Sequence, residues 1–257
     1  MEQMLKVSII TVTYNSAETI ADTIESVLKQ SYKNIEYWII DGMSKDNTLQ
    51  IIESYKDKLK GRLHWISEKD KGIYNAMNKG IVRCTGDVVG ILNSDDFFTD
   101  SMVIEKMVEA FDDDVDALYG DVHFVKANNL KKCVRYYSGK IFKPWMVKYG
   151  FIPPHPSLYI RKSVFKEYGL YVDSYKISAD FEIIARLLYK NKIKAKYLHL
   201  DFVTMRTGGT STRNWNARKL GTNEDLIACR QLGIKTNKFK IWCKFFIKTW
   251  ETIFIKS

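Results

Sequence analysis

Short apolar runs alternate with amphipathic stretches along the first part of the chain. The runs are rich in β-branched residues and end at polar residues, which is typical of buried strands. The predicted strands are Leu5–Thr13, Ile35–Ile40, Leu63–Ser67 and Val88–Leu92. The predicted helices between them are Glu18–Gln30, Asp46–Leu59 and Ile73–Val82. This alternation predicts an α/β fold with a Rossmann-like, mostly parallel central sheet flanked by helices.

The pattern becomes less regular beyond Val115. Shorter strands are predicted over Ala117–Val125, Lys132–Tyr137 and Tyr197–Met205, with an irregular loop over Lys143–Pro156. Helices are predicted over Ala179–Tyr189, Trp215–Leu232 and Phe239–Ile255. We therefore predict one large domain over residues 1–213, with halves 1–99 and 100–213, and a helical extension over 214–257.

An acidic tetrad, Asn93-Ser94-Asp95-Asp96, directly follows the fourth predicted strand. Ligands of open α/β sheets bind at the carboxyl ends of strands. Two adjacent carboxylates repel each other unless a cation or a proton offsets them, and Mg²⁺ or Mn²⁺ would suit their oxygens. The tetrad therefore indicates a divalent metal that carries a diphosphate. The alternative is a turn that caps the helix expected to begin near Asp100.

Two further strand ends carry polar residues, Thr13-Tyr14-Asn15 and Asp41-Gly42. Because parallel strands end at the same edge of a sheet, these residues and the tetrad should converge on one crevice. An apolar slot with a carboxylate at its base suits a nucleobase. Neither a G-x-G-x-x-G fingerprint nor a G-x-x-x-x-G-K-[ST] phosphate loop is present in the sequence. A bound nucleotide would have to be held by metal and carboxylates.

The net charge of +10 calls for an anionic partner, and most of the Lys and Arg excess lies between Lys131 and Ser257. The sequence has no helix-turn-helix or zinc-finger pattern, so a nucleic-acid partner is not expected. Its four cysteines lie far apart, which fits a reducing cytoplasm and predicts neither a zinc site nor a disulfide framework. No apolar run approaches the ~20 residues that cross a bilayer.

Four segments resemble, in the same order, the inverting GT-A glycosyltransferases of family 2. The segments are VSIITVTYN (7–15), IIDGMSKD (39–46), EKDKGIYNAMNKG (68–80) and LNSDD (92–96). The resemblance is strongest to the bacterial polysaccharide-assembly branch, of the colanic-acid type. It implies a GT-A fold, a nucleotide-sugar donor and a Mn²⁺ or Mg²⁺ cofactor.

The resemblance also implies roles for single residues on the donor side. Thr13, Tyr14, Asn15 and Asp41 would contact the nucleotide, Asp70 would lie near it and Lys79 would approach the pyrophosphate. Asp95 would coordinate the metal with help from Asp96. Asn93, which stands where the family has the first Asp of its D-x-D pattern, would bond to the ribose or donor sugar beside Ser94. Lys79 could equally lie on a solvated helix face.

On the acceptor side, Asp180 matches the family's catalytic base, and Glu182 is a weaker candidate for the same role. Without the resemblance, Asp180 would be interpreted as a first-turn acid stabilised by the helix dipole. His155, between prolines, matches an acceptor-site segment or is a packed turn residue. Arg206 and Arg213 flank a Gly-rich loop that would close on the diphosphate or stay exposed.

The C-terminal helix places Trp242, Phe245, Phe246, Trp250 and Ile253 at helical spacing, opposite a stripe of Lys240, Lys244 and Lys248. Such a helix suits an anionic membrane surface, or packs on the domain or on a second copy in a homodimer. We expect a cytoplasmic enzyme, peripheral at the inner face of the cell membrane. It would transfer a hexosyl or N-acetylhexosaminyl group from a UDP-sugar to a glycan or lipid-linked acceptor in cell-surface polysaccharide synthesis. The alternative is a non-catalytic nucleotide- or glycan-binding module with a degenerate site.

Overall fold

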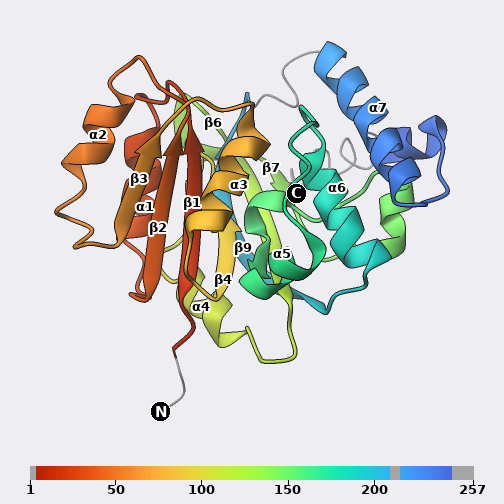
Figure 1. The fold of residues 1–257 in the computed structure, drawn as a ribbon, viewed down its shortest axis with the longest axis horizontal. Coiled ribbons are helices and arrows are strands. Elements are labelled where there is room, and N and C mark those ends of the chain that lie inside the picture. The colour runs from red at the N-terminus through yellow and green to blue at the C-terminus, as the bar shows by residue number, and fades with distance from the viewer. Residues whose placement is uncertain (1–3, 209–214, 245–257) are drawn as a thin grey trace.

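The computed structural model of the protein describes residues 4–208 and 215–244. Within these residues nine strands form one sheet, in the order β3-β2-β1-β4-β8-β6-β9-β5, with β7 paired to β6 (Figure 1). The first four strands are β1 (Val7–Thr13), β2 (Ile35–Asp41), β3 (Leu63–Ser67) and β4 (Val88–Ile91). All of them are parallel. The strands predicted from the first part of the chain are therefore confirmed.

The second part of the chain completes the sheet with mixed directions. Its strands are β5 (Phe97–Phe98), β6 (Ala117–Lys126), β7 (Asn129–Tyr137), β8 (Tyr159–Arg161) and β9 (Ala195–Arg206). The short strand β8 is antiparallel to both of its neighbours, β4 and β6, whereas β9 is parallel to β6. Four of the eight pairings described are antiparallel, so the sheet is mixed, and the predicted parallel arrangement holds for β1 to β4. The two- and three-residue strands β5 and β8 are too short to leave a periodic signal in the sequence.

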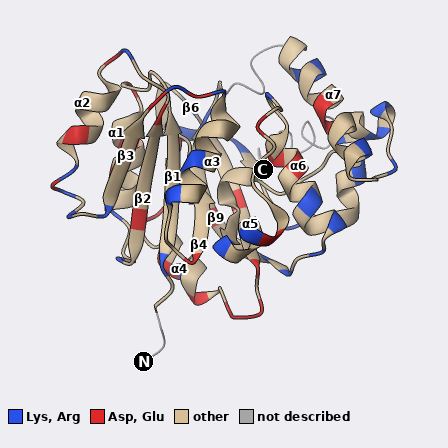
Figure 2. Cartoon of the chain, viewed as in Figure 1, with Lys and Arg blue, Asp and Glu red and all other residues tan. Residues whose placement is uncertain are grey.

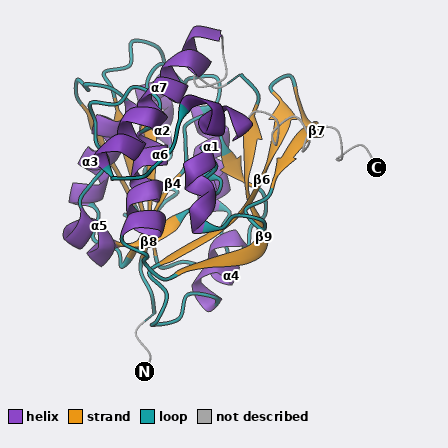
Figure 3. Ribbon diagram, turned by 90° about the vertical axis from the view of Figure 1, so that its right-hand side faces the viewer, coloured by secondary structure: helices purple, strands orange, loops and turns teal. Residues whose placement is uncertain are grey.

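Helices cover the sheet (Figures 1 and 3). They are α1 (Ile20–Leu28), α2 (Thr48–Ser54), α3 (Ile73–Arg83), α4 (Val103–Glu109), α5 (Lys162–Tyr168), α6 (Ala179–Ile184) and α7 (Trp215–Gln231). The α5 helix was not predicted. The helix predicted over Ala179–Tyr189 is α6 followed by a π-helical segment, η3 (Ala185–Lys190). The predicted irregular loop contains two 3₁₀ turns, η1 (Pro144–Tyr149) and η2 (His155–Ser157).

The core lies between the sheet and its helices, and β1 is buried along its whole length. Helix α3 packs closely on β1 because Gly80 has no side chain at the contact. A Cβ added at Gly80 would lie 2.5 Å from Cγ2 of Ile10, which is closer than packed atoms approach. The absence of a side chain at this position therefore lets α3 lie directly against β1 (Figure 1).

The end of the described chain packs on the domain. Residues 238–244 are helical, Ile241 is fully buried, and Lys244 forms an ion pair with the buried Asp225 of α7. Lys244 therefore does not belong to a solvent-facing lysine stripe. The rest of the predicted C-terminal helix lies outside the described residues, as does the predicted domain boundary at residue 213. Across residues 4–208 and 215–244, we find no helix with the length and apolar character of a membrane span.

Candidate active site

The carboxyl ends of β1, β2 and β4 are joined by side chains from the loops that follow them. Ser16 and Ser94 share a hydrogen bond of 2.9 Å between their hydroxyls, which links the β1 end to the acidic tetrad. Asn15, at φ +50°, accepts a hydrogen bond from the Lys45 amide at 2.8 Å. Its own amide donates to the Ser44 hydroxyl at 2.8 Å. The predicted convergence of these strand ends is therefore seen in the structure.

Asp41 is fully buried at the end of β2, and its carboxylate has local partners. It accepts hydrogen bonds from the Ser44 amide at 3.0 Å, the Ser44 hydroxyl at 2.5 Å and the Ser67 hydroxyl at 2.6 Å. These bonds hold the turn after β2 against the end of β3. The predicted contact between Asp41 and a base stays a prediction, and the structure gives this carboxylate a role in shaping the edge.

Beside this turn, Tyr14, Gly42 and Asp70 lie together. A Cβ added at Gly42 would lie 3.0 Å from Oδ2 of Asp70 and 3.5 Å from Cδ2 of Tyr14. The Tyr14 side chain is 59% exposed, so its ring is available to a ligand. Thr13 is buried, and its hydroxyl has no hydrogen-bond partner among the described residues. An unpaired buried hydroxyl next to an exposed ring fits an edge that is completed by a bound molecule.

Lys79 of α3 is held by two carboxylates. Its ammonium lies 2.6 Å from Oδ1 of Asp70 and 3.2 Å from Oε1 of Glu68, and it also donates to the carbonyl of Lys69 at 2.9 Å. Burial opposes the charge, but the hydrogen bonds to Asp70 and Glu68 outweigh it and raise the pKa of Lys79. The charge of Lys79 is therefore largely compensated, and its predicted contact with a pyrophosphate stays a prediction.

Asp96 is the buried member of the tetrad, at 1% exposure. It accepts a hydrogen bond from Nδ2 of Asn93 at 3.0 Å and from the amide of Arg206 at 3.3 Å. Burial, and then the charge of Asp95, raise the pKa of Asp96 to about 8. Asparagine at position 93 thus supplies a donor to a buried carboxylate, which an aspartate there could not do when ionised.

Asp95 is only partly buried, and burial raises the pKa of its carboxyl as well. The guanidinium of Arg206 lies below it, donating to the carbonyl of Asp95 at 2.5 Å and pairing with Asp22 of α1. Arg206 also lies 5.2 Å from the ring centre of Phe97. These contacts fix Arg206 beneath the tetrad, whereas a closing loop would need it free. Arg213 lies outside the described residues.

The tetrad offers two carboxylates, which is enough for a metal ion whose other ligands come from a bound molecule. Among the described residues, no cluster of three or more His, Cys, Asp or Glu side chains could enclose a metal ion. Two adjacent carboxylates with raised pKa values would be relieved by a cation. Hard divalent cations are commonly bound by one or two carboxylates together with substrate phosphates. The residues present therefore fit Mg²⁺ or Mn²⁺ held with a diphosphate.

Asp180 lies in the first turn of α6 and is tied to α3. Its Oδ1 accepts a hydrogen bond from the Phe181 amide at 2.7 Å and lies 3.4 Å from the Tyr74 hydroxyl oxygen. The same hydroxyl donates to the carbonyl of Ile177, just before the helix. Burial and the charge of Asp180 raise the pKa of Tyr74 far above its usual range, so it remains a hydrogen-bond donor. Helix α3 thus carries both Lys79, which is paired with Asp70 at the strand-end edge, and the tyrosine that contacts Asp180.

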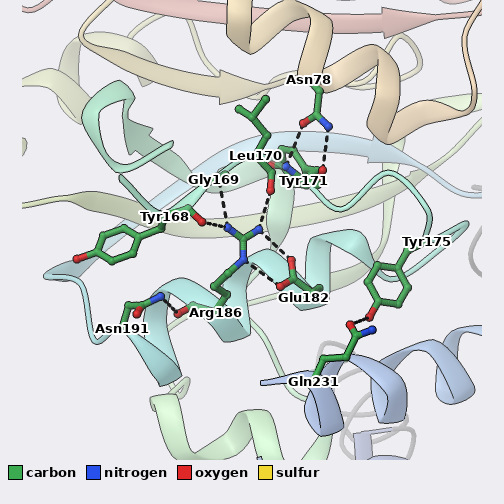
Figure 4. A network of polar contacts seen from close by, with 10 residues as sticks. All are labelled: Asn78, Tyr168, Gly169, Leu170, Tyr171, Tyr175, Glu182, Arg186, Asn191 and Gln231. Atoms are coloured by element: carbon green, nitrogen blue, oxygen red, sulfur yellow. Dashed lines mark hydrogen bonds and ion pairs between the residues drawn. The ribbon is translucent and has the colours of Figure 1, made fainter. Parts of the chain in front are cut away.

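Glu182 faces away from this arrangement. It is 4% exposed and forms a two-pronged ion pair with Arg186, at 2.9 Å for each prong. The Arg186 guanidinium also donates to the carbonyls of residues 168–170 (Figure 4). Glu182 is therefore paired with Arg186 and helps to hold residues 168–170 against α6. We assign it no part in the chemistry.

His155 lies in an aromatic stack behind the Asp180 segment. Its Nε2 is 2.7 Å from the Tyr171 hydroxyl, and Tyr171 stacks on Tyr74 with ring centres 5.9 Å apart. Burial lowers the pKa of His155 to about 4, so the ring is neutral near pH 7. Its predicted role at the acceptor stays a prediction. In the structure it supports Tyr171, which stacks on the tyrosine that contacts Asp180.

Residues 8–169 match the model of Glycosyl transferase family 2. The chain belongs to this family. The match spans every strand end described above and stops before Asp180. The family assignment thus rests on the segment that includes the ends of β1 to β4. Any role for Asp180 has to be argued from its position and contacts.

Relatives and solved structures agree with this assignment. The chain is 27% identical to the PGL/p-HBAD biosynthesis glycosyltransferase of Mycobacterium bovis, over 75% of this chain and 73% of that protein. It is 41% identical to the putative teichuronic acid biosynthesis glycosyltransferase TuaG of Bacillus subtilis, over 35% of this chain and 36% of that protein. S. aureus TarS 1-349, solved with UDP-GlcNAc, superposes with a TM-score of 0.66 and 18% identity, over 91% of this chain and 68% of that chain. The predicted GT-A fold is confirmed, and the protein is a glycosyltransferase.

Two residues of this glycosyltransferase site escaped prediction. The contact between the Tyr74 hydroxyl and Asp180 was not predicted, although a tyrosine on a buried helix face usually needs such a partner. Glu224 of α7 accepts three hydrogen bonds from the backbone before α6. No local pattern in the sequence indicates that contact, because the two segments are far apart along the chain.

Proposed function

We propose that this glycosyltransferase transfers a sugar, with inversion, from a UDP-sugar to a hydroxyl group of a glycan or lipid-linked acceptor. The observation that carries the proposal is the carboxylate pair Asp95 and Asp96, at an edge where Tyr14 and Asp70 also gather. Asp180, on the neighbouring helix, supplies a third carboxylate for a separate role. The teichuronic acid relative supports an acceptor from cell-surface polysaccharide synthesis.

The donor would lie along the ends of β1 and β2. Tyr14 and the unpaired hydroxyl of Thr13 would meet the base, and Asn93 and Ser94 would lie beside the ribose or the sugar. UDP is proposed as the nucleotide because a protein of the same fold is known with UDP-GlcNAc bound. A hexosyl or N-acetylhexosaminyl group is proposed as the transferred sugar. The colanic-acid type of pathway stays a prediction.

Asp95 and Asp96 would hold Mn²⁺ or Mg²⁺ against the diphosphate. When bound, such a cation stabilises the negative charge that develops on the departing diphosphate. The protein's own contribution is to keep two carboxylates adjacent and to fix one of them with Asn93 and the Arg206 amide. The guanidinium of Arg206 beside them partly offsets the rise in the pKa of both carboxyls that burial causes.

Asp180 would act as the base. Its carboxylate takes the proton from the acceptor hydroxyl while that oxygen forms a bond to the anomeric carbon. The bond from the anomeric carbon to the diphosphate oxygen breaks on the opposite face, so the configuration inverts. A positioned carboxylate with this role typically contributes ~10²–10⁴-fold to the rate.

A panel of nucleotide sugars tests whether the site turns over or only binds. We expect UDP release from at least one UDP-sugar when Mn²⁺ or Mg²⁺ is present, and little release with EDTA. A non-catalytic binding module would bind UDP without releasing it from any donor. Saturable donor binding without turnover across UDP- and GDP-sugars, with acceptor preparations supplied, would contradict an enzymatic role.

We also propose that the protein associates with an anionic membrane at the cytoplasmic face. Trp145 in η1 and Phe239 are 56% and 78% exposed. The segments that carry them lie side by side, because the Thr236 hydroxyl donates to the carbonyl of Lys148 and the Lys240 ammonium lies 5.9 Å from the Tyr149 ring centre. Figure 2 shows Lys and Arg on the α7 side of the molecule. Exposed aromatics among lysines suit the interface of an anionic bilayer.

The double variant Trp145→Ser with Phe239→Ser should lose most sedimentation with phosphatidylglycerol vesicles and keep donor turnover. Each exposed aromatic contributes salt-resistant binding, whereas lysines contribute about 1 kcal/mol each and fade with salt. Met102→Ser is the matched control, since Met102 is another exposed apolar residue, at 43%. A change in oligomeric state with unchanged vesicle binding would instead mark a contact between two copies of the chain.

A further inference from the structure

One side chain of helix α7, the carboxylate of Glu224, bonds to the backbone segment that precedes Asp180. Glu224 is 7% exposed and points at the backbone just before α6. Its Oε1 accepts the Lys176 amide at 2.9 Å, and its Oε2 accepts the amides of Ile177 at 2.9 Å and Ser178 at 3.0 Å. Three successive backbone donors therefore end on one side chain, two residues ahead of the proposed base.

The same segment is held from its other side by α3. The Tyr74 hydroxyl donates to the carbonyl of Ile177 and also contacts Oδ1 of Asp180. The Ser178 hydroxyl adds a 3.1 Å bond to the carbonyl of Gly221 in α7. The backbone amides thus point to Glu224 and a carbonyl points to Tyr74, which fixes the orientation of the peptide planes from which Asp180 projects.

We propose that Glu224 is a positioning residue for Asp180, and that α7 is therefore part of the catalytic apparatus. The proposal rests on the proposed role of Asp180 as base. Hydrogen bonds to an ionised acceptor are about twice as strong as neutral ones, so a carboxylate can hold three amides where a neutral side chain cannot. Glutamine at position 224 keeps the shape but presents one amide group, with its own hydrogens, to backbone donors.

Glu224→Gln should lower kcat for the accepted donor by ~10–10²-fold, because a displacement of about 1 Å at a reacting group costs up to this much. The donor KM should stay near the wild-type value, since the nucleotide edge belongs to β1, β2 and β4. Gln231→Ala is the matched control. Gln231 also lies on α7 and accepts a 2.7 Å bond from the Tyr175 hydroxyl, a side chain and not the backbone ahead of Asp180 (Figure 4). This variant should keep wild-type kcat.

A double-mutant cycle with Asp180→Asn separates positioning from general destabilisation. If Glu224 acts through Asp180, Glu224→Gln should cost little in the Asp180→Asn background, less than about twofold. Losses that multiply in the double variant, or a Glu224→Gln enzyme with wild-type kcat, would overturn the proposal. If Asp180→Asn itself has no effect, the proposed base has failed instead. If Glu224→Gln does not fold, Ser178→Ala, which removes a single bond to α7, should lower kcat in the same cycle.

Discussion

Replacing Asp180 with asparagine should lower the rate of donor turnover by ~10²–10⁴-fold and leave the affinity for UDP near the wild-type value. Asparagine keeps the size of the side chain and its bond from the Phe181 amide, but it has no affinity for a proton at neutral pH. The loss should therefore fall on kcat. The measurement is UDP release from the accepted UDP-sugar, together with a calorimetric titration of UDP.

Asp173→Asn is a suitable control for this variant. Asp173 lies on the loop ahead of α6, and its carboxylate also bonds to α3, through Nδ2 of Asn75 at 2.8 Å. It resembles Asp180 in its side chain and in its attachment to α3, but among the described residues no hydrogen bond joins it to Tyr74. We expect wild-type turnover. An Asp180→Asn enzyme that is as fast as this control would show that another group takes the proton.

Asp95→Ala should remove metal-dependent donor turnover almost completely. The substitution leaves Asp96 as the single carboxylate of the tetrad, and Asp96 is buried with bonds to Asn93 and the Arg206 amide. Raising the Mn²⁺ concentration should not restore the wild-type rate, because the more accessible of the two carboxylates is gone. UDP release measured across a Mn²⁺ titration tests this directly.

Asp100→Ala is the matched control for Asp95→Ala, because Asp100 is an exposed carboxylate that follows the tetrad and β5. Its Oδ1 accepts the Met102 amide at 2.7 Å, which forms a local turn ahead of α4. Turnover and its metal dependence should remain. If Asp95→Ala behaves like Asp100→Ala, then the tetrad is only a turn, and the alternative considered from the sequence is right.

The donor half of the site could be predicted from the sequence because it is local. Each strand end places its polar residues at one edge of a parallel sheet, and four short segments carry the family resemblance. Asn15, Ser94 and Asp70 therefore lie where their positions in the pattern indicated. The parallel direction of the first four strands also follows from the alternation of strands and helices.

The acceptor half could not be predicted to the same degree, because its contacts join distant segments. Glu182 and Asp180 stand two residues apart and look alike in sequence, yet one is paired with Arg186 and the other contacts Tyr74. Lys79 and Arg206 were expected at the diphosphate, but the structure pairs them with Asp70 and Asp22. A sequence shows the charge of a side chain, and only the fold shows which partner compensates it.

Calorimetric titration of the wild-type protein with UDP, in Mn²⁺ and in EDTA, tests the central claim most directly. The claim is that Asp95 and Asp96 hold a divalent cation that carries the nucleotide diphosphate. We predict clear binding of UDP with Mn²⁺ and loss of most of that affinity with EDTA. Equal affinity for UDP under the two conditions would contradict the account.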